Sequence, residues 1–183
     1  MSHGPSASGG AVVQPPPGHH DEPYVPVFTA GGAPRAKLDD ILTRYPTKQA
    51  GLLPALWIVQ DERGWVSEHA MKEVGDVLGL TAAYVKGVVT FYTMYHQHPV
   101  GKWFIQVCTT SCCNCMGAEG VVKAFLEQTG CGELGLTSAD GKYTVIEVEC
   151  LGACGFSTPI MINDEFIDSV SVAKVPEILG KYC

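Results

Sequence analysis

The spacing of apolar residues along the chain changes from helical to strand-like near residue 100. Between about residues 36 and 95, apolar side chains recur every three or four positions, which is typical of amphipathic helices. Beyond residue 100 there are short runs rich in β-branched and aromatic residues, separated by loops that contain glycine. The pattern predicts a helical first part and a mixed second part.

Four short helices are predicted in the first part, each bounded by a residue that starts or stops a helix. Ser or Thr at the N-cap accepts a hydrogen bond from the first turn, Gly ends a helix in the left-handed conformation, and the residue before Pro avoids the α region. The predicted boundary residues are Tyr45 and Pro46 after the first helix, Leu52 and Gly64 around the second, Ser67 and Gly79 around the third, and Thr81 before the fourth. Four helices with brief connections predict a small bundle, whose aromatic residues we expect mainly in its core.

The second part is predicted to contain strands and helices in the order β-α-β-β-β-α. The predicted strands are residues 103–107, 143–149, 160–162 and 165–167, and the predicted helices are residues 117–129 and 175–182. The last two strands flank Asn163 and Asp164 and read as a hairpin. We therefore expect an α+β chain with a disordered Pro/Gly-rich tail at residues 1–33, a helical bundle at 34–98 and an α/β domain at 99–183. The apolar patch at residues 24–28 is expected to lie along a partner or along the protein itself.

Composition and charge exclude several classes of protein. Hydrophobic residues make up 46% of the chain, which excludes wholesale disorder. The net charge is −7 and the basic residues are scattered, so nucleic acid is not an expected partner. Neither an apolar stretch of about 20 residues nor a signal peptide is present, so we expect a cytoplasmic protein that meets a membrane only through partners.

All eight cysteines lie in the second half of the chain, which locates the expected chemistry there. A reducing compartment disfavours structural disulfides and leaves metal binding or thiol chemistry. Cys108 and Cys113 follow one predicted strand, and Cys150 and Cys154 follow another. If those strands are neighbours, their ends bring the four thiols together.

Four thiolates suit a tetrahedral zinc ion or an iron–sulfur cluster, and the spacing favours a [2Fe–2S] cluster with two thiolates on each iron. The residues leave alternatives open. Cys112 or Cys115 can replace Cys113 as a ligand, and the pair Cys112/Cys115 has the spacing of a thioredoxin-like dithiol. A zinc-stapled interaction module remains the second hypothesis.

Several separated motifs, in their order along the chain, resemble those of one protein family. They are residues 108–113 (CTTSCC) with Gly117, residues 149–155 (ECLGACG), residues 162–164 (IND), and in the helical half residues 53–57, 64–66, 91–95 and 99–102. Together they resemble the thioredoxin-like [2Fe–2S] subunit of NADH:quinone oxidoreductase, respiratory complex I. The resemblance runs from about residue 36 to residue 182.

The resemblance implies a helical bundle followed by a thioredoxin-like domain whose [2Fe–2S] cluster is held by Cys108, Cys113, Cys150 and Cys154. It implies no catalytic residue in this chain: FMN and NADH belong to a partner flavoprotein subunit, with which the cluster exchanges one electron, and further iron–sulfur subunits complete the assembly. The part of the complex that would contain this chain, its peripheral arm, then lies at the cytoplasmic face of a bacterial membrane, or on the matrix side in a mitochondrion. Related subunits serve NAD-dependent formate dehydrogenases and hydrogenases, which keeps those parent complexes as alternatives.

Three residues depart from the family pattern. Cys112 stands where proline is frequent, Met116 stands where arginine is frequent, and Pro159 comes one residue later than the usual Ala-Pro. These departures affect the expected shape of the loops rather than the implied ligand set.

Overall fold

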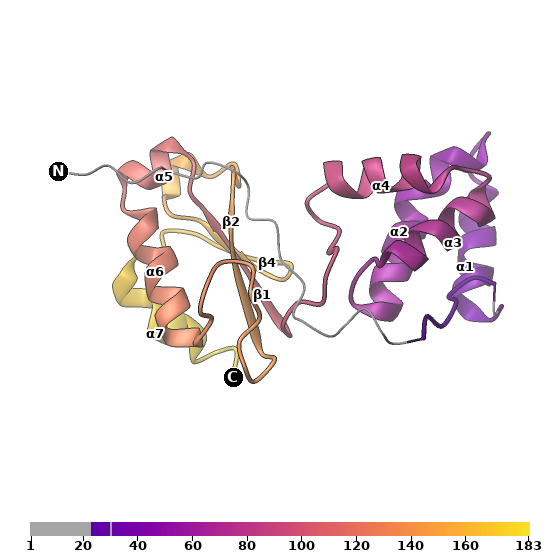
Figure 1. Cartoon of the computed structure of the whole chain (residues 1–183). Coiled ribbons are helices and arrows are strands. Elements are labelled where there is room, and N and C mark those ends of the chain that lie inside the picture. Colours follow the sequence, from indigo (N-terminus) through magenta and orange to yellow (C-terminus); the bar gives the residue numbers. More distant parts are fainter. Residues whose placement is uncertain (1–22, 30) are drawn as a thin grey trace. The chain divides into compact units, whose positions relative to one another are not determined.

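A boundary between Pro99 and Val100 separates two structural units of the chain. The computed structural model describes residues 23–29 and 31–183, so the tail predicted for residues 1–33 lies mostly outside the described residues. The unit before the boundary is helical, and the unit after it contains a four-stranded sheet with helices (Figure 1). The chain therefore has the α+β architecture that the apolar spacing predicts.

The helical unit contains the four predicted helices and one additional short 3-10 helix. The elements are α1 (Ala33–Leu42), η1 (Lys48–Gly51), α2 (Leu52–Arg63), α3 (Glu68–Leu78) and α4 (Ala82–Phe91). The side chain of Ser67 accepts from the N–H of Ala70 at 3.1 Å, and that of Thr81 accepts from the N–H of Tyr84 at 3.2 Å. Both predicted N-caps are therefore confirmed, and Gly64 and Gly79 end α2 and α3 in the left-handed conformation.

Helix α1 ends earlier than predicted, at Leu42 rather than at Tyr45. The N–H groups of Arg44 and Tyr45 bond to carbonyls only three residues back, so the chain has already left the α-helical pattern before Pro46. Tyr45 is 40% exposed and does not join the predicted apolar face. Local turn bonds therefore end this helix before the proline does.

Residues 24–29, here called the N-terminal strap, lie along the helical unit. Val27 and Phe28 of the strap are buried in the same core as Leu38 and Val74. Between the two alternatives for the apolar patch, packing along the protein itself is the one that the structure contains. The strap is also tied to α3, because the carboxylate of Glu73 accepts hydrogen bonds from its backbone.

The aromatic residues of the helical unit divide between core and surface, against the expectation that they lie mainly inside. Tyr95 is 3% exposed and donates to the carbonyl of Leu53 at 3.0 Å, whereas Phe91 is 76% exposed. Tyr84 and Tyr92 are also partly exposed, and with Val88 they line a groove of about 380 Å³. The expectation was wrong for Phe91 because apolar spacing does not tell which side of a helix meets a neighbour.

The second unit is built on a mixed sheet with the strand order β2-β1-β3-β4. Its elements are β1 (Trp103–Cys108), α5 (Ser111–Cys115), α6 (Ala118–Thr129), β2 (Tyr143–Val148), η2 (Cys154–Phe156), β3 (Ile160–Ile162), β4 (Glu165–Ile167), η3 (Val172–Lys174) and α7 (Val175–Leu179). Strands β1 and β2 are parallel, and β3 runs antiparallel to both β1 and β4. Helices α6 and α7 lie along one face of the sheet (Figure 1). Strand side chains of the same core, such as Ile105, Val145 and Ile162, are almost completely buried.

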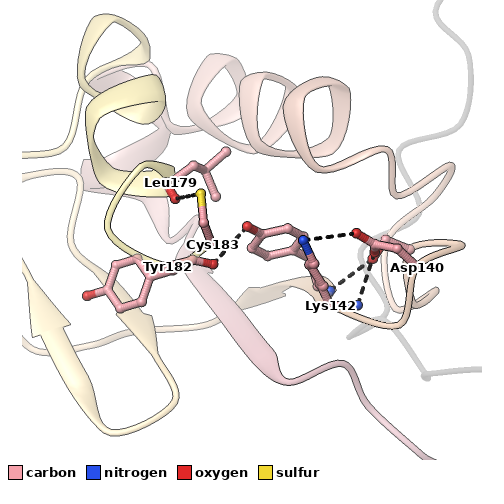
Figure 2. A network of polar contacts seen from close by, with 7 residues as sticks. Asp140, Lys142, Leu179, Tyr182 and Cys183 are labelled. Atoms are coloured by element: carbon pink, nitrogen blue, oxygen red, sulfur yellow. Dashed lines mark hydrogen bonds and ion pairs between the residues drawn. The ribbon is translucent and has the colours of Figure 1, made fainter.

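Side-chain hydrogen bonds fix both ends of this unit. Asn163 occupies the predicted hairpin turn with φ 51°, a conformation that Asn tolerates, and its side chain accepts from the N–H of Phe104 at 2.8 Å. At the C-terminus, the hydroxyl of Tyr143 donates to the carbonyl of Tyr182 at 2.8 Å, and the Cys183 thiol lies 3.6 Å from the carbonyl oxygen of Leu179 (Figure 2). The last residues of the chain are thereby held beside the beginning of β2.

Within residues 23–29 and 31–183, no single helix is long and apolar enough to cross a membrane. Helices α3 and α4, which are strongly bent relative to each other, reach the length and apolar composition of a membrane-spanning segment only when they are counted together.

Candidate metal centre

Two loops that carry cysteines leave the same edge of the sheet. Because β1 and β2 are parallel and Cys108 is in register with Val148, both strands end at this edge. The N–H of Thr109 donates to the carbonyl of Val148 at 3.1 Å, and the Cys108 thiol lies 3.4 Å from the carbonyl oxygen of Glu149. The two strands that precede the cysteine loops are therefore neighbours, as expected, and the gathering of all four thiols stays a prediction.

The first loop brings two thiols into direct contact. The Sγ atoms of Cys113 and Cys108 are 3.3 Å apart, and both side chains are buried. Cys113 reaches this position because residues 111–115 form the short helix α5, in which the N–H groups of Cys113 and Asn114 bond to the carbonyl of Thr110. The apolar pattern did not predict α5, since a five-residue helix has no apolar periodicity; the Thr-Ser pair before the cysteines, a frequent helix start, was the available signal.

The second loop carries two exposed thiols. Cys150 accepts from the N–H of Gly152 at 3.3 Å, and Gly152 has φ 78°, which a residue with a side chain rarely adopts. Glycine at this position therefore lets a backbone amide approach sulfur. Cys154 begins the turn η2, and the nearby thiols of Cys150 and Cys112 raise its pKa.

The surroundings set a different proton affinity for each thiol. Burial raises the pKa of Cys108, but the N–H groups of Thr110 and Leu151 and the neighbouring Cys113 outweigh burial, so the net pKa lies below the usual value. Burial raises the pKa of Cys113; the hydroxyl of Ser157 opposes this rise, and the pKa remains above the usual value. The first loop is therefore arranged so that Cys113 donates to a thiolate at Cys108.

An apolar wall and a helix N-terminus border the buried thiols. Ala118, the first residue of α6, is buried with Cys108 and Cys113, and Leu151 packs against the same cluster. The positive end of the α6 dipole therefore lies beside the thiols, where it favours negative charge on sulfur. In the same two loops, Met116 is 71% exposed and Phe156 is 62% exposed.

The donor set fits an iron–sulfur cluster in its chemistry. Soft thiolates with backbone N–H groups directed at sulfur are the usual surroundings of such clusters. The thiols are not gathered at one point: within the described residues, no group of three or more His, Cys, Asp or Glu is arranged to hold a single metal ion. The Cys113 thiol contacts that of Cys108, and in the second loop the nearby thiols of Cys150 and Cys112 raise the pKa of Cys154.

The remaining cysteines have separate places. Cys131 is buried, with its thiol 3.4 Å from the carbonyl oxygen of Tyr143 at the start of β2, and Cys183 follows Tyr182, which is bonded to the same tyrosine. Both are therefore at the end of β2 opposite to Val148. Cys115 is exposed at the end of α5.

Some groups of the site were not found by sequence reasoning. They are the hydroxyl of Ser157 and the N–H groups of Thr110 and Leu151. Every residue other than proline carries a backbone N–H, so residue type gives no signal for such donors. Only the path of the two loops shows which of them reach sulfur.

Comparisons with known proteins find relatives that match most of the chain. A family model described as thioredoxin-like [2Fe–2S] ferredoxin matches residues 38–183. An NADH-quinone oxidoreductase subunit from Pseudomonas aeruginosa is 37% identical over 155 residues, which are 85% of this chain and 93% of that protein. The Escherichia coli protein of the same name is 32% identical over 163 residues, covering 89% of this chain and 98% of that protein. A mitochondrial NADH dehydrogenase [ubiquinone] flavoprotein 2 from Dictyostelium discoideum is 36% identical over 148 residues, covering 79% of this chain and 60% of that protein.

Among solved structures, an NAD⁺-reducing [NiFe]-hydrogenase in the air-oxidized state aligns with a TM-score of 0.61 and 19% sequence identity. The alignment covers 72% of this chain and only 22% of the hydrogenase chain. At this level of identity the likeness concerns the fold.

Proposed function

This chain belongs to the family of thioredoxin-like [2Fe–2S] ferredoxins, and from that membership we infer that it is the [2Fe–2S] electron-transfer subunit of an NADH–quinone oxidoreductase. We propose that Cys108 and Cys113 bind one iron and that Cys150 and Cys154 bind the other. The observation that carries this proposal is the pair of cysteine loops at the shared end of β1 and β2. When bound, such a cluster accepts and releases one electron at a time.

The residues of this chain hold and tune the site. The N–H groups of Thr110, Leu151 and Gly152 donate to ligand sulfurs, which disperses negative charge on them. Ala118 and Leu151 shield the buried pair from water. No general acid or base is needed, because electron transfer makes and breaks no bond in a substrate.

The partner is a flavoprotein subunit that carries FMN and the NADH site. Met116 and Phe156, one from each cysteine loop, are exposed apolar side chains that a partner subunit would shield from water. In the helical unit, exposed Phe91 and the groove beside Tyr84 and Tyr92 offer a second contact surface. Further iron–sulfur subunits would complete the complex, which meets the membrane only through other subunits, on its cytoplasmic or matrix side.

Metal and sulfide analysis tests the cofactor. Protein purified without air should contain about two irons per chain, with inorganic sulfide, and should give a paramagnetic signal after dithionite reduction. Zinc without sulfide would instead support an interaction module without a redox role. NADH should reduce the cluster only when the flavoprotein subunit is added, and subunits that copurify with the chain distinguish a quinone reductase from a formate dehydrogenase or a hydrogenase.

Alanine variants test the ligand set. Cys108→Ala and Cys113→Ala should each lose iron and sulfide, because a buried iron is left with one protein thiolate. Cys131→Ala is the matched control, since it removes a buried cysteine from the opposite end of β2 and should leave the iron content unchanged. Full iron in Cys113→Ala would contradict the proposed ligands.

A further inference from the structure

Two of the proposed ligands, Cys108 and Cys113, contact each other through their sulfur atoms. The Cys113 thiol donates to the Cys108 sulfur, and the two Sγ atoms are 3.3 Å apart. A disulfide bond has about 2.05 Å between its sulfurs, so these two need to approach by roughly 1 Å. The pair is therefore placed for a covalent reaction as well as for binding a metal.

The surroundings hold this pair of thiols in contact. Both side chains are buried, Cys108 at 2% and Cys113 at 1% exposed, in one apolar cluster with Ala118 and Leu151. Cys108 ends strand β1, which the sheet holds in place, and the N–H of Cys113 bonds to the carbonyl of Thr110 at 2.7 Å. Two groups that the fold keeps in contact react with each other far more readily than groups that must first meet.

The other cysteines are placed differently. Five of them are exposed to solvent: Cys112, Cys115, Cys150, Cys154 and Cys183. The sixth, Cys131, is buried, but its thiol lies 3.4 Å from the carbonyl oxygen of Tyr143. Exposed thiols react with a small disulfide from solvent, and thiol–disulfide exchange then passes the bond to the pair that forms it most favourably. The contact between their sulfurs makes Cys108 and Cys113 that pair.

We propose that Cys108 and Cys113 form a reversible disulfide in the metal-free protein, and that this disulfide closes the site to iron until a thiol reduces it. The closure rests on the proposed function, because it requires both residues to be iron ligands. The oxidant is a small disulfide such as oxidised glutathione. One cysteine sulfur attacks it and a glutathione thiolate leaves; the other cysteine sulfur then displaces the second glutathione. Two electrons pass to glutathione, and the two cysteine protons end on the two glutathione thiols.

The disulfide withdraws two ligands together and keeps them recoverable. A sulfur in a disulfide has no thiolate to offer to iron. It is also held back from oxidation to the sulfinic acid, which thiols do not reverse. A chain that waits for its cluster thus keeps its buried ligands in a form that reduction restores.

Redox titration of the full chain tests the disulfide. The reduced, metal-free protein is equilibrated without air in glutathione buffers, free thiols are blocked with iodoacetamide, and thiols released by later reduction are labelled with N-ethylmaleimide. Trypsin cuts after Lys102 and Lys123, and in the peptide between them the second label should appear on Cys108 and Cys113 together. Half oxidation should need a ratio of oxidised to squared reduced glutathione at least about tenfold lower than for any other cysteine.

Unfolded protein and matched variants separate the effect of the fold from that of the sequence. In concentrated urea the second label should spread over the four cysteines of the same peptide, because the contact between Cys108 and Cys113 is lost. Cys112→Ala removes the exposed neighbour and should keep the wild-type midpoint. Cys113→Ala removes the partner and should raise the midpoint of Cys108 by at least about tenfold.

Iron uptake tests the closed site. Ferrous iron and sulfide should load the protein in which only this pair is oxidised at least about tenfold less than the reduced protein, and dithiothreitol should restore the loading. Equal loading of the oxidised and reduced forms would overturn the closure.

The remaining outcomes separate the disulfide from the proposed function. The disulfide is overturned if, in the folded wild-type protein, the second label falls on Cys112 or Cys115 in place of Cys113, or if urea leaves its distribution unchanged. Neither result depends on whether a variant folds. If the reduced protein itself takes up no iron with sulfide, the proposed function fails, and the labelling decides the disulfide by itself.

Discussion

Replacing Glu73 by Gln should release the N-terminal strap from α3. The Glu73 side chain is only 6% exposed, and its carboxylate accepts from the N–H groups of Val27, Phe28 and Thr29 at 2.7 to 2.9 Å. It also accepts from the hydroxyl of Tyr24. Gln has the same shape but offers N–H groups in place of one oxygen, so it cannot accept from every donor that the strap presents.

The expected loss follows from the donors that Gln leaves unsatisfied. The oxygen that binds Phe28 and Thr29 can be kept, while the N–H of Val27 then faces an amide nitrogen. A buried donor without an acceptor costs about 1–3 kcal/mol, and a hydrogen bond to a charged group contributes about 1.5–3 kcal/mol. The loss of stability cannot exceed the free energy that holds the strap in place, because beyond that point the strap detaches. Detachment exposes Val27 and Phe28, at a cost of about 1.5–3 kcal/mol each. We expect the free energy of unfolding to fall by about 2–4 kcal/mol.

The effect should depend on pH with a defined sign. Burial raises the pKa of Glu73, but the hydrogen bonds from Tyr24 and the strap amides outweigh it, so the net pKa is lowered. A carboxylate with a lowered pKa in the folded state stabilises the protein above the unfolded-state value of about 4.3 and loses that contribution as pH falls through the folded value. The stability difference between wild type and Glu73→Gln should be full at pH 7 and shrink below about pH 4.

Hydrogen exchange of residues 24–29 and urea unfolding measure the two parts of this prediction. Asp76→Asn is the matched control, because it neutralises an exposed carboxylate on the same helix, whose solvent-screened ion pair with Lys72 contributes little to stability. The reasoning is refuted if Glu73→Gln exchanges and unfolds as Asp76→Asn does, or if the stability difference is unchanged at about pH 3.

Further substitutions test close packing and a buried hydroxyl. Gly75→Ala should destabilise the helical unit by about 1–3 kcal/mol, because the added Cβ would lie 2.7 Å from a backbone carbonyl oxygen. Gly87→Ala, whose Cβ would meet open space on α4, should instead stabilise the unit by about 0.5–1 kcal/mol. Equal thermal unfolding of the two variants would contradict this. Gly101→Ala should cost about 1–3 kcal/mol in urea unfolding, since its Cβ would meet the backbone of Tyr143 at 2.7 Å. Burial raises the pKa of Tyr95 to about 12. The neutral side chain therefore contributes fully to the free energy of unfolding below its ordinary pKa of 10, and this contribution should be lost as pH rises to about 12. Tyr95→Phe should remove that pH dependence and cost about 1 kcal/mol at neutral pH, as alkaline titration of stability would measure.

Local chemistry made much of the secondary structure predictable. Ser67 and Thr81 cap helices because their side chains accept from amides three residues away, and Gly64, Gly79 and Gly130 end helices because glycine adopts positive φ without strain. These interactions involve neighbours in the sequence, so the sequence carries their full signal. Helix α1 was the exception, because turn bonds after Leu42 ended it before Pro46 could.

Part of the candidate centre was predictable for a related reason. Two pairs of cysteines follow two predicted strands, and parallel pairing of β1 and β2 places both pairs at one edge of the sheet. The choice between Cys112 and Cys113 was not predictable from spacing, because it depends on the five-residue helix α5, which buries the Cys113 thiol against Cys108 and leaves Cys112 exposed. The assignment of ligands remains a prediction for the variants to test.

The sequence by itself determined where most helices and strands begin and end, which residues carry sulfur, and the family to which they point, since each follows from residue type and short spacing. Only the tertiary structure decided that Glu73 holds a strap more than forty residues away in the sequence, that Phe91 faces solvent, and that the thiol of Cys113 lies against that of Cys108. Such contacts depend on which faces of distant segments meet, and the free energy that selects them comes from burial summed over the whole core rather than from any local pattern.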